Sequence, residues 1–146
     1  MKENERFAEK AERSYIVCFS DECPLHEECL RWLVGQHIPK RQEQCACVNR
    51  RMDGAGTKEC PMHRPSKKVM MAKGMTRIYT DDMPRKVERG VRSSLIAMTN
   101  RPYYFRYRNG TMLIPPQLQE KIRHLFRQYG WNERVEFDEY VEDYNW

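Results

Sequence analysis

The stretch "ECPLHEEC", residues 22–29, contains a five-residue word that returns as "ECPMH" at residues 59–63. Cysteine and histidine side chains are common ligands of transition metals, so the two copies can be two halves of one metal site. A proline after a small polar residue also suits the first turn of a helix, so both copies can instead begin helices. The pattern alone leaves both interpretations open.

The cysteine spacing favours a metal site. Cys18, Cys23 and Cys29 lie close together in the sequence, and Cys60 repeats the Cys-Pro pair. Soft thiolates at short spacing suit zinc or an iron–sulfur cluster, and four of them complete a structural site. Tight C-x2-C pairs, which mark zinc ribbons, are absent. We therefore predict Cys18, Cys23, Cys29 and Cys60 as metal ligands, with zinc or an iron–sulfur cluster as the cofactor.

Other ligand sets stay open. A continuous helix over residues 23–29 would separate Cys23 and Cys29 by about 9 Å along its axis, too far for one zinc ion. Either the helix begins after Cys23 or His26 replaces one thiol. The secondary candidates are His26, His63, Cys45 and Cys47. The alternative is that the cysteines are buried thiols, since cysteine is among the most buried residue types.

Composition limits the compartment and the number of domains. At 146 residues, the chain has the length of a single domain. No apolar run approaches the roughly 18 residues that a membrane helix needs. The charged N-terminus lacks the apolar segment of a signal peptide, so we expect a cytoplasmic protein whose cysteines are reduced.

Charge is unevenly distributed along the chain. The net charge is +5, but residues 64–108 hold twelve Lys or Arg against three Asp or Glu. Residues 133–146 hold six acidic residues and one arginine. The basic middle can bind a polyanion, or the acidic end can fold back on it.

Hydrophobic periodicity predicts an α+β fold, mainly helical, in a single domain. We expect a cysteine-rich lobe over residues 15–63, with a long loop at 35–58, and a helix-hairpin-helix part over 64–146. The closing segment "FDEYVEDYNW" carries four aromatic residues, so we expect it to pack on the protein, with three of them on one helical face. The expected helices cover residues 5–14, 24–34, 66–79, 82–98 and 116–129.

The one predicted β-hairpin lies in "YYFRYRNGTMLI", residues 103–114. Its aromatic residues alternate, and Asn109-Gly110 suits the positive φ angles of a type I′ turn. One strand face would present Tyr104, Arg106 and Arg108, and together with Arg101 these residues are candidates for nucleic-acid binding. The alternative is that the aromatic residues are core and the arginines a solvated outer face.

Several motifs together resemble a known family. They are "CFSDECPLHEECLR", "ECPMH", "PYYFRYRNG", "IPPQLQEKIRHLFRQYGW" and "FDEYVEDYNW". They are similar to a family of small cysteine-containing proteins from anaerobic gut bacteria, known only as a domain of unknown function. The resemblance spans residues 15–146, and the family pattern has cysteines that match Cys18, Cys23, Cys29 and Cys60 but none that support Cys45 or Cys47. An anaerobic origin would make an iron–sulfur cluster more plausible.

These observations favour a non-enzymatic binding module with a structural metal site, whose partner is a nucleic acid. The alternative is a protein-interaction or regulatory module that binds no nucleic acid and whose cysteines are only buried thiols. An enzyme is not predicted, because the sequence lacks a Ser-His-Asp order, a phosphate loop and an H-E-x-x-H motif.

Overall fold

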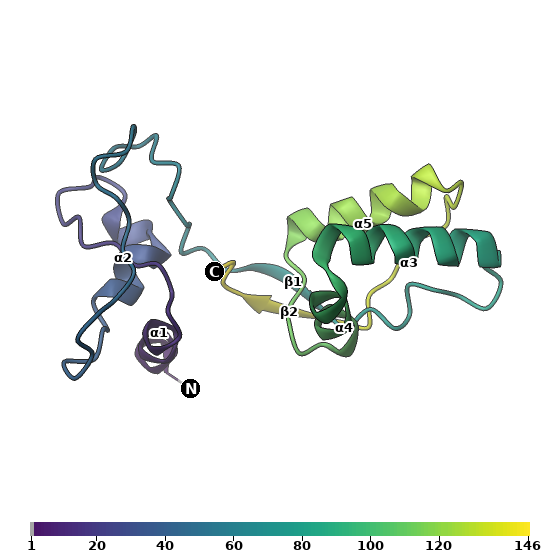
Figure 1. The fold of residues 1–146 in the computed structure, drawn as a ribbon, viewed down its shortest axis with the longest axis horizontal. Coiled ribbons are helices and arrows are strands. Elements are labelled where there is room, and N and C mark those ends of the chain that lie inside the picture. The colour runs from purple at the N-terminus through teal and green to yellow at the C-terminus, as the bar shows by residue number, and fades with distance from the viewer. Residues whose placement is uncertain (1) are drawn as a thin grey trace. The chain divides into compact units, whose positions relative to one another are not determined.

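The computed structural model describes residues 2–146, which form two compact units (Figure 1). We call the residues up to Lys67 together with Asn145–Trp146 the cysteine unit, and Lys68–Tyr144 the helical unit. Helices and one antiparallel pair of strands occur in the same chain, so the predicted α+β class is confirmed. Among the described residues, every helix is too short or too polar to cross a membrane.

The cysteine unit is small and mostly irregular. It contains α1 (Glu3–Glu12), the 3-10 helix η1 (His26–Glu28) and α2 (Leu30–Gly35). Backbone hydrogen bonds join its segments that lack helix. Val17 N–H donates to Ala46 O at 3.0 Å, and Val48 N–H donates to Val17 O at 2.9 Å. The last residue of the chain completes this unit, because the Trp146 ring packs edge-on against Phe7 and Tyr15.

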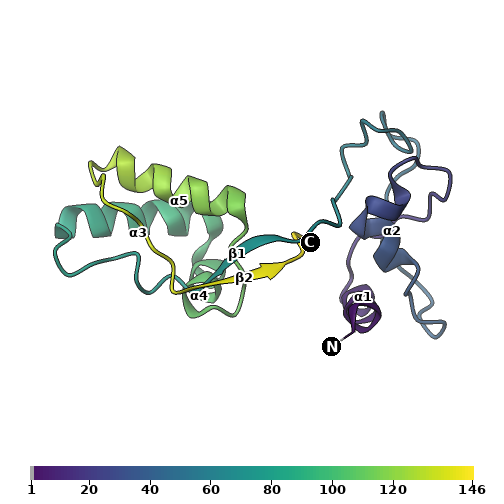
Figure 2. The same cartoon turned by 180° about the vertical axis from the view of Figure 1, so that it is seen from behind.

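The helical unit holds a two-stranded sheet and three helices. β1 (Val69–Lys73) pairs antiparallel with β2 (Glu139–Asp143), and Met71 lies opposite Val141. Figure 2 shows the two strands side by side. Ala72 also exchanges backbone hydrogen bonds with Ile114, at 2.9 and 2.8 Å, which fixes the segment before the last helix.

The helices of this unit surround one apolar core. They are α3 (Arg85–Thr99), α4 (Arg101–Asn109) and α5 (Pro116–Gln128). The buried positions of α3 and α5 recur at helical spacing, which confirms the two helices that periodicity predicted. The buried residues of α3, α4 and α5 are Val87, Val91, Leu95, Tyr104, Gln119, Ile122 and Phe126.

The hairpin predicted over residues 103–114 is wrong. Residues 101–109 form α4 instead, with Asn100 capping its start and Gly110 ending it at φ 77°. A glycine with positive φ serves a helix C-terminus as well as it serves a type I′ turn. The Asn-Gly pair therefore fitted both structures, and the packing of Tyr104 in the core selects the helix.

Three further expectations need correction. Residues 66–79 form β1 and a loop instead of a helix, and residues 24–34 form the short η1 and α2 instead of one helix. The closing segment does pack, since Phe137 and Tyr144 are 3% and 5% exposed. Its central part is strand β2, so the helical face expected there is wrong.

Candidate functional site

The repeated word of the cysteine unit folds into the same turn twice. The similarity extends to seven residues, "SDECPLH" at 20–26 and "TKECPMH" at 57–63. In each copy the cysteine N–H donates to the carbonyl three residues earlier, and the histidine N–H donates to the cysteine carbonyl. The bonds are Cys23–Ser20 (3.2 Å) and His26–Cys23 (3.1 Å), then Cys60–Thr57 (3.2 Å) and His63–Cys60 (3.2 Å).

Backbone pairing holds the two turns together. An isolated antiparallel bridge joins Cys29, after the first turn, to Pro65, after the second. Two hydrogen bonds flank the bridge, from Leu30 N–H to Arg64 O at 2.7 Å and from Ser66 N–H to Glu28 O at 3.0 Å. The helix-start interpretation holds only for the first copy, where η1 begins at His26.

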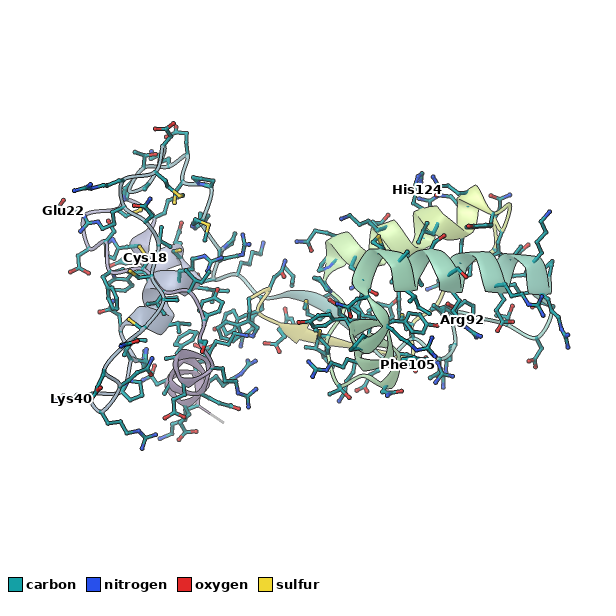
Figure 3. The ribbon with its side chains drawn as sticks, viewed as in Figure 1. Cys18, Glu22, Lys40, Arg92, Phe105 and His124 are labelled. Atoms are coloured by element: carbon teal, nitrogen blue, oxygen red, sulfur yellow. The ribbon has the colours of Figure 1, made fainter. Side chains whose placement is uncertain are left out.

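All four predicted ligand cysteines line one cavity, and Figure 3 shows Cys18 among other sulfur atoms of the unit. The cavity volume is about 30 Å³. Pockets for small organic molecules measure roughly 300–1,000 Å³, so this cavity suits an ion and not an organic substrate. The metal-binding residue types in its wall are Cys18, Cys23, His26, Cys29, Cys60 and His63.

The thiols surround the cavity without converging on one point. Among residues 2–146, no three His, Cys, Asp or Glu side chains are grouped closely enough to hold a metal ion. Burial raises the pKa of the Cys18 thiol, the Ser20 N–H opposes that shift, and the neighbouring cysteines raise it further. Cys18 is therefore a neutral thiol at pH 7, and binding a metal there requires the release of its proton.

The two histidines of the repeated turns differ. His26 Nδ1 lies 2.8 Å from Cys23 O, and the ring packs edge-on against Trp32 at 4.6 Å between centroids. His63 Nδ1 is buried and has no hydrogen-bond partner among the described residues. A buried polar atom without a partner costs about 1–3 kcal/mol, which makes His63 an unexplained polar group in the cavity wall.

Cys45 and Cys47 lie apart from this arrangement. Both are exposed, and neither lines the cavity. Cys47 instead forms a parallel backbone bridge with Val17. The structure thus separates the four predicted ligand cysteines from the two secondary ones.

The candidate nucleic-acid residues all lie on α4. Arg101 and Arg106 are exposed, whereas Tyr104 is buried with its hydroxyl 3.1 Å from that of Tyr79. Tyr104 therefore has no ring face open to a base. Sequence reasoning missed Tyr103 and Phe105, which are 42% and 40% exposed, because strand alternation placed them on the inner face.

Arginine side chains cover these exposed rings. The Arg101 guanidinium lies 5.5 Å from the Phe105 ring centre, and that of Arg106 lies 5.7 Å from the Tyr103 ring centre. Arg108, the remaining candidate, is half-buried near the end of α4. The outer face of α4 is thus basic and aromatic, and helical spacing would have found it.

A model of a family of unknown function (DUF6078) matches residues 1–146. The chain belongs to this family. The resemblance to a domain of unknown function is thereby confirmed, over the whole chain and not only from residue 15. No curated protein and no solved structure matches the chain. Membership of DUF6078 assigns no activity.

Proposed function

We propose that this protein is a non-enzymatic, cytoplasmic binding module. Its cysteine unit carries a structural metal site, and its helical unit binds nucleic acid. The main support for the metal site is the small cavity that all four predicted ligands line, namely Cys18, Cys23, Cys29 and Cys60. The unpartnered His63 Nδ1 in the same wall supports a polar or ionic occupant.

Zinc is the metal that this cavity favours. Four thiolates satisfy a tetrahedral zinc ion and leave no open position, as in structural sites. A cavity of about 30 Å³ suits a single ion better than a cubane of four irons and four sulfides. An iron–sulfur cluster is the alternative, because thiolates are also the ligands of such clusters. Bound metal would link the two repeated turns to each other and to Cys18 and Cys29.

Nucleic acid is the partner that the charge of α3 and α4 favours. Residues 85–109 hold seven Lys or Arg and one Glu. Such a surface attracts phosphates through the release of bound counterions. A protein partner is the second candidate, because Tyr103 and Phe105 are large exposed rings of a kind enriched at protein interfaces. Salt-dependent binding to nucleic acid would favour the first over the second.

Metal analysis tests the first half of this proposal. The full chain is purified without air, and its zinc, iron and visible absorption are measured. We expect about one zinc per chain, lost in Cys60→Ser and retained in the matched control Cys45→Ser. Iron with strong visible absorption would identify a cluster instead. A chain purified without metal that also fails to take up zinc or a reconstituted cluster overturns the metal site.

A further inference from the structure

We propose that α3 and α4 form a helix-turn-helix and that α4 is a recognition helix for the major groove of double-stranded DNA. This inference rests on the nucleic-acid binding proposed above and names its form. It depends on the connection between the two helices, on how α4 is held, and on what its free face presents.

The connection is a single residue. Asn100 adopts φ 73° and ψ 161°, its N–H donates to Ile96 O at 2.8 Å, and its side-chain oxygen accepts from Tyr103 N–H at 3.0 Å. The same residue therefore ends α3 and begins α4. Helix-turn-helix motifs join two crossed helices by a short turn, usually of 3–4 residues, and this turn is tighter. Figures 1 and 2 both show α4 running crosswise to α3.

The inner side of α4 is fixed to the helical unit. The Tyr104 side chain is 1% exposed and belongs to the apolar core. Carbonyls near the C-terminal end of α4 accept backbone hydrogen bonds from other segments, Arg106 O from Met112 at 3.1 Å and Arg108 O from Met75 at 3.2 Å. A rigidly held helix can enter a groove without the entropic cost of ordering.

The free side of α4 presents cations and no acid. Arg101, Tyr103, Phe105 and Arg106 are exposed, and residues 101–109 contain no Asp or Glu. A helix of about 10–12 Å diameter fits a major groove about 12 Å wide. Arginine is the commonest side chain to read guanine there, and the N-terminal residues of a recognition helix reach the base edges. Arg101 occupies the first position of α4, so we expect it to contact bases.

The covered aromatic rings favour duplex DNA over single strands. A base stacks on an open ring face, as on the platforms that bind single strands. The guanidinium groups of Arg101 and Arg106 lie over the rings of Phe105 and Tyr103. One face of each ring is therefore already occupied, whereas the guanidinium edges remain available for phosphates and base edges.

Fluorescence anisotropy with the full, metal-loaded chain tests this proposal. The probes are a labelled DNA duplex of mixed sequence, each of its single strands, and the corresponding RNA duplex. We expect the DNA duplex to bind most tightly and Arg101→Ala to weaken it roughly tenfold or more. The matched control is Arg127→Ala, an exposed arginine on α5. It should change the affinity by less than a factor of two or so, because it removes one exposed charge from a helix other than α4.

The outcomes separate this inference from the proposed function. Tighter binding of single strands or of RNA overturns the recognition helix and leaves nucleic-acid binding intact. Equal losses in Arg101→Ala and Arg127→Ala also overturn it, because the attraction would then be diffuse. No binding to any of the probes overturns both. Because Arg101 and Arg127 are exposed, both variants should keep the melting temperature of the native chain, and that measurement excludes misfolding as the cause of a loss.

Discussion

The two units bury very different amounts of apolar side chain. Among the described residues, the cysteine unit has seven buried apolar residues and the helical unit has fifteen. The longest helix has 10 residues in the first unit and 15 in the second. A chain segment with so small a core is marginal by itself and is commonly stabilised by metal or disulfides. The small core of the cysteine unit is therefore a physical reason to expect a stabilising metal in that unit.

Metal removal should produce the largest difference between the units. We expect a chelator, or Cys60→Ser, to unfold the cysteine unit, since structural zinc contributes on the order of 10 kcal/mol in small domains. The helical unit should remain folded on its own core. Hydrogen exchange resolved by residue would show fast exchange before Lys67 and protected amides in α3 and α5. Uniform protection after complete metal loss would contradict the role given to the metal.

A core substitution should produce the opposite pattern. Phe126 is fully buried in the helical unit, so Phe126→Ala should destabilise that unit by about 3–5 kcal/mol. Metal content and the protection of α1 and α2 should stay unchanged. Denaturant unfolding, followed by hydrogen exchange in each unit, measures the stability of the helical unit and the protection of the cysteine unit. If the cysteine unit unfolds with the helical one, the two units are not independent.

The C-terminal residue should act on the unit that begins the chain. The Trp146 ring contacts Phe7 and Tyr15, and Lys10 Nζ lies 5.0 Å from its centre. We expect Trp146→Ala to destabilise the cysteine unit by about 1–3 kcal/mol, through lost packing and lost cation–π attraction. Tyr140→Ala, an exposed aromatic of β2, is the control. Faster exchange in α1 for the first variant alone is the expected readout.

Asp138 should make the helical unit sensitive to acid. Burial alone would raise the pKa of this carboxyl, but hydrogen bonds from Thr76 and from the Arg77 N–H lower it overall. A lowered pKa in the folded state stabilises the fold above the ordinary carboxyl pKa, and the benefit disappears as pH falls through the folded value.

Asp138→Asn should therefore lower the free energy of unfolding of the helical unit by about 1–2 kcal/mol at pH 7. The difference in stability between this variant and the native chain should shrink below about pH 4. Glu142→Gln, an exposed carboxyl of β2, should show neither effect. Thermal melts over a pH series measure this, and a difference that stays constant with pH would exclude the carboxylate as its cause.

The smallest expected effect concerns the end of α4. Gly110→Ala should cost about 1 kcal/mol for the positive φ alone. An added Cβ at Gly110 would also lie 3.2 Å from Lys73 Cγ, whereas at Gly130, also with positive φ, it would meet nothing within 4 Å. Gly130→Ala therefore measures the destabilisation that comes from the positive φ angle alone. Equal melting temperatures for the two variants would mean that the Lys73 side chain moves aside freely.

Local sequence determined the parts whose signal lies within one element. The apolar spacing of α3 and α5 predicted both helices, because an amphipathic stripe needs only its own residues. The repeated Cys-Pro word marked the two turns that line the cavity, because each turn is closed by hydrogen bonds within seven residues. Metal binding by those cysteines remains a prediction.

Tertiary structure decided what local signals left ambiguous. Residues 69–73 lie in the middle of the chain and become a strand because they pair with β2, near its C-terminal end, with Val69 opposite Asp143. Asn109-Gly110 suits a hairpin or a helix end equally well, and only the burial of Tyr104 in a core built by distant segments selects the helix. In the helix, the side chains no longer alternate between two faces as they would in a strand. Tyr103 and Phe105 are therefore exposed together with Arg101 and Arg106. Propensity acts between neighbours in sequence, whereas burial depends on residues that only folding brings together.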